Sequence, residues 1–186
     1  MRCFIAIELP EAIRSRLRGL QDHLNGLSPI VRWTRPEQIH LTIKFLGEVP
    51  DDRIAQVCST TVEVAAAHAA FRLQVRGAGC FPPYGNPRVL WAGLHEPPDN
   101  LLRLHRDLDA ALARLGYPPE NRAFSPHLTI GRVREGRSAH GVRPAVQACA
   151  AFGTEPFAVT ELIVFQSILR GGQSPVYVPL ARAPLA

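Results

Sequence analysis

The residues of this chain that could do chemistry occur in one short sequence, His-Leu-Thr-Ile, which appears at 40–43 and again at 127–130. Both copies are apolar and β-branched enough to form a strand. Side chains alternate along a strand, so the His and the Thr of one copy share a face while the Leu and the Ile point into a core. Each copy is therefore expected to offer an imidazole and a hydroxyl side by side.

Two such pairs facing one cleft would suit the cleavage of a phosphodiester without a metal. One group must activate the attacking oxygen and another must protonate the leaving oxygen. Imidazoles can do both, because their ordinary pKa of about 6.5 keeps both protonation states available near neutrality. Thr42 and Thr129 could donate hydrogen bonds to the negative charge of the transition state. The two copies thus predict a catalytic pair, His40 and His127.

Other chemistries have weaker support in the sequence. A single strand histidine is more often structural than catalytic, and the other five histidines follow no pattern. No His-Glu-x-x-His motif occurs, and no histidine has a Cys or Asp at ligand spacing, so no metal is expected. There is also no phosphate-binding Gly-x-x-x-x-Gly-Lys-Ser/Thr loop, so ATP-driven ligation is not indicated and no cofactor is predicted.

The elements expected to position these residues alternate between strands and amphipathic helices. Helices are expected at 10–25, 51–68 and 97–115, with a weaker one at 142–151. Strands are expected at 2–9, 31–33, 40–45, 71–75, 88–94, 127–133, 162–169 and 176–180. Loops are expected at 77–87, 118–126, 135–141 and 171–175, where Gly, Pro or polar residues gather.

This order predicts an α+β fold with antiparallel-rich sheets. The two His-Leu-Thr-Ile copies are 87 residues apart (127 − 40), and each is followed by a helix and two further strands. We therefore expect a single compact domain, residues 1–186, made of two pseudo-symmetric lobes. In this interpretation, two sheets flank a central cleft with the helices outside, and each lobe contributes one His-x-Thr-x motif.

The composition is that of an ordinary globular protein, with 186 residues, 46% hydrophobic and 20% charged. The net charge of +5 comes mainly from arginine, whose planar fork suits phosphate. This excess fits an anionic substrate such as nucleic acid, and an arginine-rich proteome would explain it equally well.

The four cysteines, at 3, 58, 80 and 149, are expected to be buried, reduced thiols. Without a secretory signal or an apolar membrane span, the sequence predicts a cytoplasmic protein with no membrane contact. No apolar stripe is left unexplained, so a monomer with no obligate protein partner is expected.

Longer stretches around the two motifs resemble the two-histidine phosphoesterase superfamily, and most closely its RNA 2′,3′-cyclic phosphodiesterases, historically called 2′-5′ RNA ligases. The matching stretches are residues 2–10, 33–47, 88–93, 124–132 and 165–177. The resemblance implies a bilobal α+β fold and metal-free hydrolysis of RNA 2′,3′-cyclic phosphate ends to 2′-phosphates, as in tRNA and other RNA processing. It also implies a weak, reversible, ATP-independent 2′-5′ joining activity.

The resemblance also implies roles for individual residues. His40 would be the general acid for the leaving 3′-oxygen and His127 the base for water, while Thr42 and Thr129 would hold non-bridging oxygens. Arg132 could clamp phosphate, although strand parity turns it away from the cleft unless the strand breaks at Gly131.

Aromatic side chains could stack on bases, and the candidates are Phe124, Trp33 and Tyr84. For Phe45, parity favours core packing. The loop at 81–86 and the arginines at 132, 134 and 137 could border the cleft. Two alternatives stay open, namely a phosphodiesterase for a small cyclic-phosphate nucleotide and a non-catalytic RNA-binding module.

Overall fold

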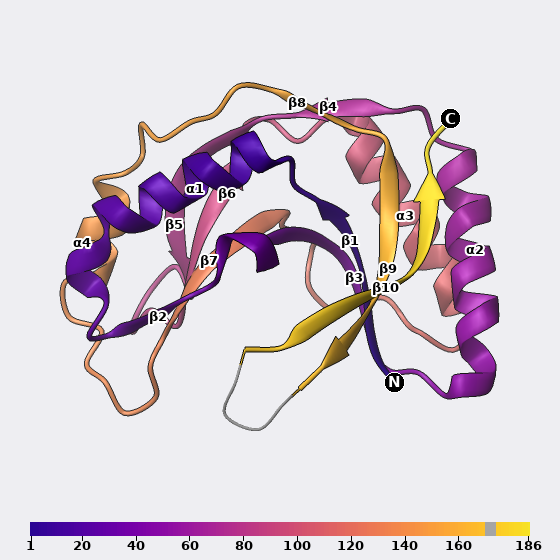
Figure 1. The fold of residues 1–186 in the computed structure, drawn as a ribbon, viewed down its shortest axis with the longest axis horizontal. Coiled ribbons are helices and arrows are strands. Elements are labelled where there is room, and N and C mark those ends of the chain that lie inside the picture. The colour runs from indigo at the N-terminus through magenta and orange to yellow at the C-terminus, as the bar shows by residue number, and fades with distance from the viewer. Residues whose placement is uncertain (170–173) are drawn as a thin grey trace.

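The computed structural model describes residues 1–169 and 174–186. Its main sheet has the strand order β10-β9-β1-β3-β7-β6-β5, with β2 also paired to β7, and a second sheet consists of β4 and β8. Figure 1 shows the main sheet running through the molecule, with α4 (Val142–Gln147) at one end and α2 (Ile54–Ala66) at the other. The main-sheet strands are β1 (Arg2–Glu8), β2 (Val31–Trp33), β3 (His40–Glu48), β5 (Val75–Phe81), β6 (Val89–Leu94), β7 (His127–Val133), β9 (Glu161–Ile168) and β10 (Val176–Pro184).

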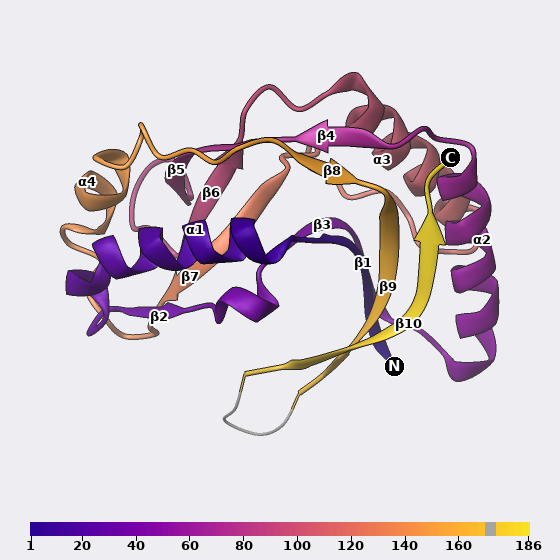
Figure 2. The same ribbon diagram turned by 45° about the horizontal axis from the view of Figure 1, so that its top comes forward.

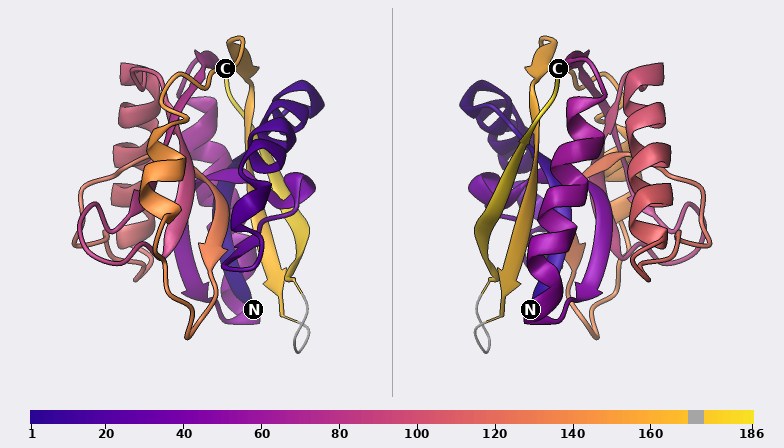
Figure 3. Two further views of the ribbon diagram at one scale, coloured as in Figure 1. Left: turned by 90° about the vertical axis from the view of Figure 1, so that its left-hand side faces the viewer. Right: turned by 90° about the vertical axis from the view of Figure 1, so that its right-hand side faces the viewer.

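The smaller sheet pairs β4 (Phe71–Leu73) with β8 (Phe157–Val159), and the two strands lie side by side in Figure 2. The helices are α1 (Glu11–His23), α2 (Ile54–Ala66), α3 (Asp99–Ala113) and α4 (Val142–Gln147), of which α2 and α3 stand next to each other in the right-hand view of Figure 3. Short 3-10 turns occupy residues 25–27, 36–38 and 51–53. Among the described residues, no helix is both long enough and apolar enough to cross a membrane.

The α+β class and the duplicated, antiparallel architecture are confirmed. In the described part of the chain, every strand pair of the main sheet is antiparallel, in agreement with the antiparallel-rich sheets expected from the sequence. The two sets of strands are not separate sheets, because β3 and β7 join them through the pair Leu41–Leu128. The two His-Leu-Thr-Ile copies therefore meet at the centre of one continuous sheet.

One face of the sheet at this centre is covered by helices. Leu41 and Leu128 are both fully buried, in a cluster that also contains the inward-facing leucines of α1 and α3. Those helix residues recur every three or four positions, which is the spacing that gives a helix one apolar stripe. Because the leucines occupy the covered face, the histidines and threonines between them point to the opposite one.

The predicted loop at 77–87 is partly wrong, because β5 runs through its first five residues. Glycines disfavour strands in general, but Gly79 has a packing reason for being here. A Cβ at position 79 would lie 2.2 Å from Cζ2 of Trp91, so only glycine lets the indole pack flat against the strand. The predicted helix at 142–151 is shorter than expected, and most of the predicted loop at 171–175 lies outside the described residues.

The cysteines are largely as expected. All four are free, with Cys3, Cys80 and Cys149 buried and Cys58 half-buried. Burial raises the pKa of the Cys3, Cys58 and Cys149 thiols, which keeps them protonated and unreactive near neutral pH.

Candidate active site

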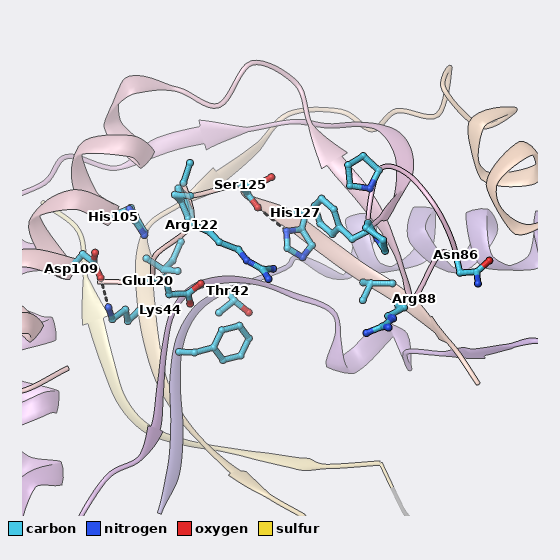
Figure 4. A pocket seen from close by; sticks show the side chains of 18 residues that line it. Thr42, Lys44, Asn86, Arg88, His105, Asp109, Glu120, Arg122, Ser125 and His127 are labelled. Carbon is cyan, nitrogen blue, oxygen red and sulfur yellow. Dashed lines mark hydrogen bonds and ion pairs between the residues drawn. The ribbon is translucent and has the colours of Figure 1, made fainter. Parts of the chain in front are cut away.

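The four polar side chains of the two motifs come together at the junction of β3 and β7. Antiparallel pairing around Leu41 and Leu128 sets His40 opposite Thr129 and Thr42 opposite His127. Each histidine therefore has the threonine of its own motif on the same strand and that of the other motif across the strands. In Figure 4, Thr42 and His127 face the same space.

Both imidazoles are held in the same way. Nδ1 of His40 lies 2.8 Å from the carbonyl oxygen of Gln38, and Nδ1 of His127 lies 2.7 Å from that of Ser125. A carbonyl oxygen can only accept a hydrogen bond, so Nδ1 must carry the proton in both rings. Nε2 is then the free nitrogen of each histidine, and it is the atom that can take or give a proton.

Aromatic rings surround His40. Its imidazole stacks on Phe4 with a centroid separation of 4.7 Å, and Tyr177 meets it edge-on at 5.2 Å. This burial lowers the pKa of His40 to about 4, although the hydrogen bond with the Gln38 carbonyl acts in the opposite direction. His40 is therefore neutral at pH 7 in the unliganded protein.

His127 packs edge-on against Phe81, with centroids 5.0 Å apart, and it borders a cavity of about 950 Å³. The cavity begins at Thr42 and His127 and extends beneath residues 118–126 in one direction and toward Arg88 in the other (Figure 4). Its aromatic lining includes Phe45 and Phe124. The Arg122 side chain points into the cavity toward His127 and Thr42.

A β-bulge follows each His-x-Thr pair. On β3, Thr42 pairs with Ala6 and Lys44 with Ile5, which leaves Ile43 as the extra residue. On β7, Thr129 pairs with Trp91 and Gly131 with Leu90, which leaves Ile130 as the extra residue. A bulge shifts the alternation of side chains by one position. Residues five positions after each histidine consequently return to the face that carries the histidines.

The bulges decide the orientation of Phe45 and Arg132. Phe45 lines the cavity and is 59% exposed, so the prediction that it packs in the core was wrong. Arg132 pairs with Val89 and therefore lies on the face that carries the histidines, next to the cavity but not among the residues that line it. The Tyr177 ring, which packs edge-on against His40, has its pKa raised by burial. The positive charge of Arg132 lowers the pKa of Tyr177 in opposition, so Arg132 lies near this ring.

The three predicted stacking residues lie in three different surroundings in the structure. Phe124 lines the cavity and stacks on His105, with ring centroids 3.8 Å apart. Trp33 lies on the covered face of the sheet, where its Cε3 would be 2.9 Å from a Cβ at Gly131, and its Nε1 donates to Ser28 Oγ at 2.9 Å. Tyr84 is 86% exposed and is not part of the cavity lining. Only Phe124 is therefore brought to the candidate site.

Several cavity residues were not predicted from the sequence, among them Lys44 and Arg122. Lys44 is 3% exposed, forms an ion pair with Asp109 on α3 and donates to the Pro118 carbonyl at 2.6 Å. It thereby anchors the segment at 118–126 that carries Arg122. The bulge at Ile43 turns Lys44 inward, and neither Lys44 nor Arg122 has a local signal in the sequence.

Over residues 1–169 and 174–186, no three His, Cys, Asp or Glu side chains are grouped closely enough to hold a metal ion.

Comparison with known proteins agrees with this architecture. The sequence matches the family model of LigT-like phosphoesterases twice, over residues 7–91 and 93–177. The chain belongs to the LigT-like phosphoesterase family, which includes 2′,3′-cyclic phosphodiesterases. The RNA 2′,3′-cyclic phosphodiesterase of Archaeoglobus fulgidus is 32% identical over 180 residues, covering 97% of this chain and 98% of that protein.

Solved structures show the same fold. TT0787 of Thermus thermophilus superimposes with a TM-score of 0.83 at 28% identity, covering 100% of this chain and 98% of that one. E. coli LigT in complex with 3′-AMP superimposes with a TM-score of 0.77 at 28% identity, covering 99% and 97% of the two chains.

Proposed function

We propose that this protein hydrolyses 2′,3′-cyclic phosphate ends of RNA to 2′-phosphates without a metal or another cofactor, using His40 and His127. The observation that carries the proposal is the matched pair of imidazoles, each with Nδ1 held by a main-chain carbonyl and with Nε2 free. The relatives named RNA 2′,3′-cyclic phosphodiesterase support the choice of substrate.

In the proposed reaction, water attacks phosphorus in line with the bond to the 3′-oxygen. His127 Nε2 takes a proton from the water while His40 Nε2 gives a proton to O3′, and the P–O3′ bond breaks to leave a 2′-phosphate. The Thr42 and Thr129 hydroxyls donate to the non-bridging oxygens, where negative charge builds up. With a 5′-hydroxyl of RNA as the attacking group in place of water, the same steps would form a 2′-5′ bond without ATP, and their reverse would cleave that bond.

This division of roles requires the bound substrate to raise the pKa of His40. A general acid must be protonated, yet burial keeps His40 neutral in the unliganded protein. A phosphate anion against Nε2 favours the charged imidazole and raises its pKa. NMR titration of the ring with and without bound 2′-AMP tests this: the midpoint should rise from about 4 toward neutrality. An unchanged midpoint would reverse the assignment and make His40 the base.

We also propose that residues 1–186 work as a single domain of two pseudo-symmetric lobes, each supplying one His-x-Thr-x motif. Two matches to the same family model support the repeat, because each match contains one motif. The shared site at the β3–β7 junction is the reason why neither lobe would be active alone.

The decisive experiment uses EDTA-treated protein and an RNA oligomer that ends in a 2′,3′-cyclic phosphate. We expect a 2′-phosphate as the only product, without metal or ATP. A 3′-phosphate would contradict the proposed leaving group. Bound RNA with no turnover would instead identify a non-catalytic RNA-binding module.

A phosphodiesterase for a small cyclic nucleotide is the second candidate, because the cavity has room for a whole mononucleotide. Its volume of about 950 Å³ lies within the range of sites that enclose a small ligand. Turnover of a cyclic mononucleotide as fast as that of an oligomer with the same end would support this alternative.

A further inference from the structure

We propose that Arg32 and Arg132 form a second anion site, which binds the phosphodiester on the 5′ side of the terminal nucleotide. The inference rests on the proposed function, and it adds a preference for polynucleotide ends over cyclic mononucleotides.

The pairing of β2 with β7 places these two arginines together. Arg32 and Arg132 are direct partners in the antiparallel register, and side chains of such partners share one face of the sheet. The other face is occupied, since a Cβ at Gly131 would point at Val31 Cγ1, 2.7 Å away. Both guanidinium groups therefore lie on the face that carries the histidines, and both residues are exposed.

The charge at this point is not balanced by the protein. Like charges directly opposite each other destabilise a sheet. Arg14, Arg18 and Arg182 each form an ion pair with a glutamate, whereas in the described parts of the chain neither Arg32 nor Arg132 does so. A bound anion would relieve this repulsion, and phosphate fits because a guanidinium can bind two of its oxygens at once.

The position of Arg132 relative to the reaction centre indicates which phosphate of the RNA the two arginines would bind. Because of the bulge at Ile130, Arg132 is the next residue after Thr129 on the cleft face of β7. Thr129 and Arg132 pair with Trp91 and Val89, which are two residues apart on β6. Two steps along a strand span about 6–7 Å, which is comparable to one nucleotide of extended RNA. Arg132 also pairs with Val89, which lines the cavity together with Arg88, so Arg132 lies directly beside the cavity. An RNA with a cyclic phosphate at its 3′ end has one neighbouring phosphate, on the 5′ side.

The test compares a dinucleotide and a mononucleotide that both end in a 2′,3′-cyclic phosphate. We expect Arg32→Gln to lower the dinucleotide-to-mononucleotide ratio of kcat/KM about tenfold, the loss expected for one charge-assisted hydrogen bond. The control is Arg114→Gln, which removes the same charge from an exposed position at the end of α3 and should leave the ratio unchanged. Equal effects of the two variants, or an unchanged ratio in Arg32→Gln, would overturn the proposal.

A binding measurement separates this inference from the proposed function. Adenosine 2′,5′-bisphosphate carries the additional phosphate that 2′-AMP lacks. The wild-type protein should bind the bisphosphate about tenfold more tightly than 2′-AMP, and Arg32→Gln should abolish that difference. Equal affinities in the wild type would refute the second site even if the enzyme is active. A clear difference without any turnover would refute the proposed reaction and leave the second site standing.

Discussion

Leu41 and Leu128 pair across β3 and β7 at the point where the two halves of the main sheet meet. Both side chains are completely buried, so the covered face of the sheet holds this junction in place. The opposite face then carries the two histidines, each across from a threonine of the other motif. The candidate site is thus a direct consequence of the register between two strands that are far apart in the sequence.

Replacement of either histidine should remove most activity while the fold is kept. General acid–base catalysis contributes about 10²- to 10⁴-fold, so His40→Ala and His127→Ala should each lower kcat by that amount. His23→Ala, at the exposed end of α1, is the matched control and should be fully active. Circular dichroism and kinetics on a cyclic-phosphate RNA measure both properties, and full activity in either site variant contradicts the mechanism.

The burial of His40 should make stability depend on pH. The pKa of this imidazole is about 4 in the folded protein and about 6.5 in an unfolded chain. Between these values the unfolded state binds a proton that the folded state does not. The free energy of unfolding should therefore fall as the pH drops from 6.5 to 4, by about 3 kcal/mol from this group, and the contribution is absent above 6.5.

Urea unfolding at pH 7 and pH 4, for wild type and His40→Gln, measures this contribution. The variant should lose less stability on acidification than the wild type does, because glutamine does not titrate. The same loss in both proteins would show that the acid sensitivity comes from other groups.

Phe45 should act on substrate binding rather than on the fold. Its ring is exposed in the cavity beside Thr42, where a base could stack on it. Stacking of a base on an aromatic ring contributes about 1–3 kcal/mol, so Phe45→Ala should raise KM for a nucleoside cyclic phosphate about tenfold. Ethylene glycol cyclic phosphate, which has no base, should be cleaved equally well by both proteins. A similar loss on both substrates would argue against stacking.

The Lys44–Asp109 ion pair should be important for stability. Lys44→Met leaves a largely buried carboxylate without its partner, which should cost about 3–5 kcal/mol. The double variant Lys44→Met/Asp109→Leu removes both charges and should be more stable than Lys44→Met alone. Urea unfolding of the three proteins tests this, and additive losses would show that the two residues do not interact.

Most of the fold could be predicted from local patterns. The leucines of α1 and α3 repeat every three or four residues, and the alternation within each His-Leu-Thr-Ile copy identifies its buried side. Strand β5 was missed because Gly77 and Gly79 indicate a loop. The reason for Gly79 is the ring of Trp91, which belongs to another strand and gives no signal near position 79.

The amino-acid sequence by itself determined the paired motifs, their strand conformation and the face on which each histidine lies, because these follow from the alternation of neighbouring residues. Only the tertiary structure decided that β3 and β7 are neighbours, and that bulges at Ile43 and Ile130 turn Phe45 and Arg132 toward the cleft. It also placed Trp33 on the covered face and Arg32 opposite Arg132. Register and bulges depend on packing between segments that are distant in the chain, so no local pattern encodes them.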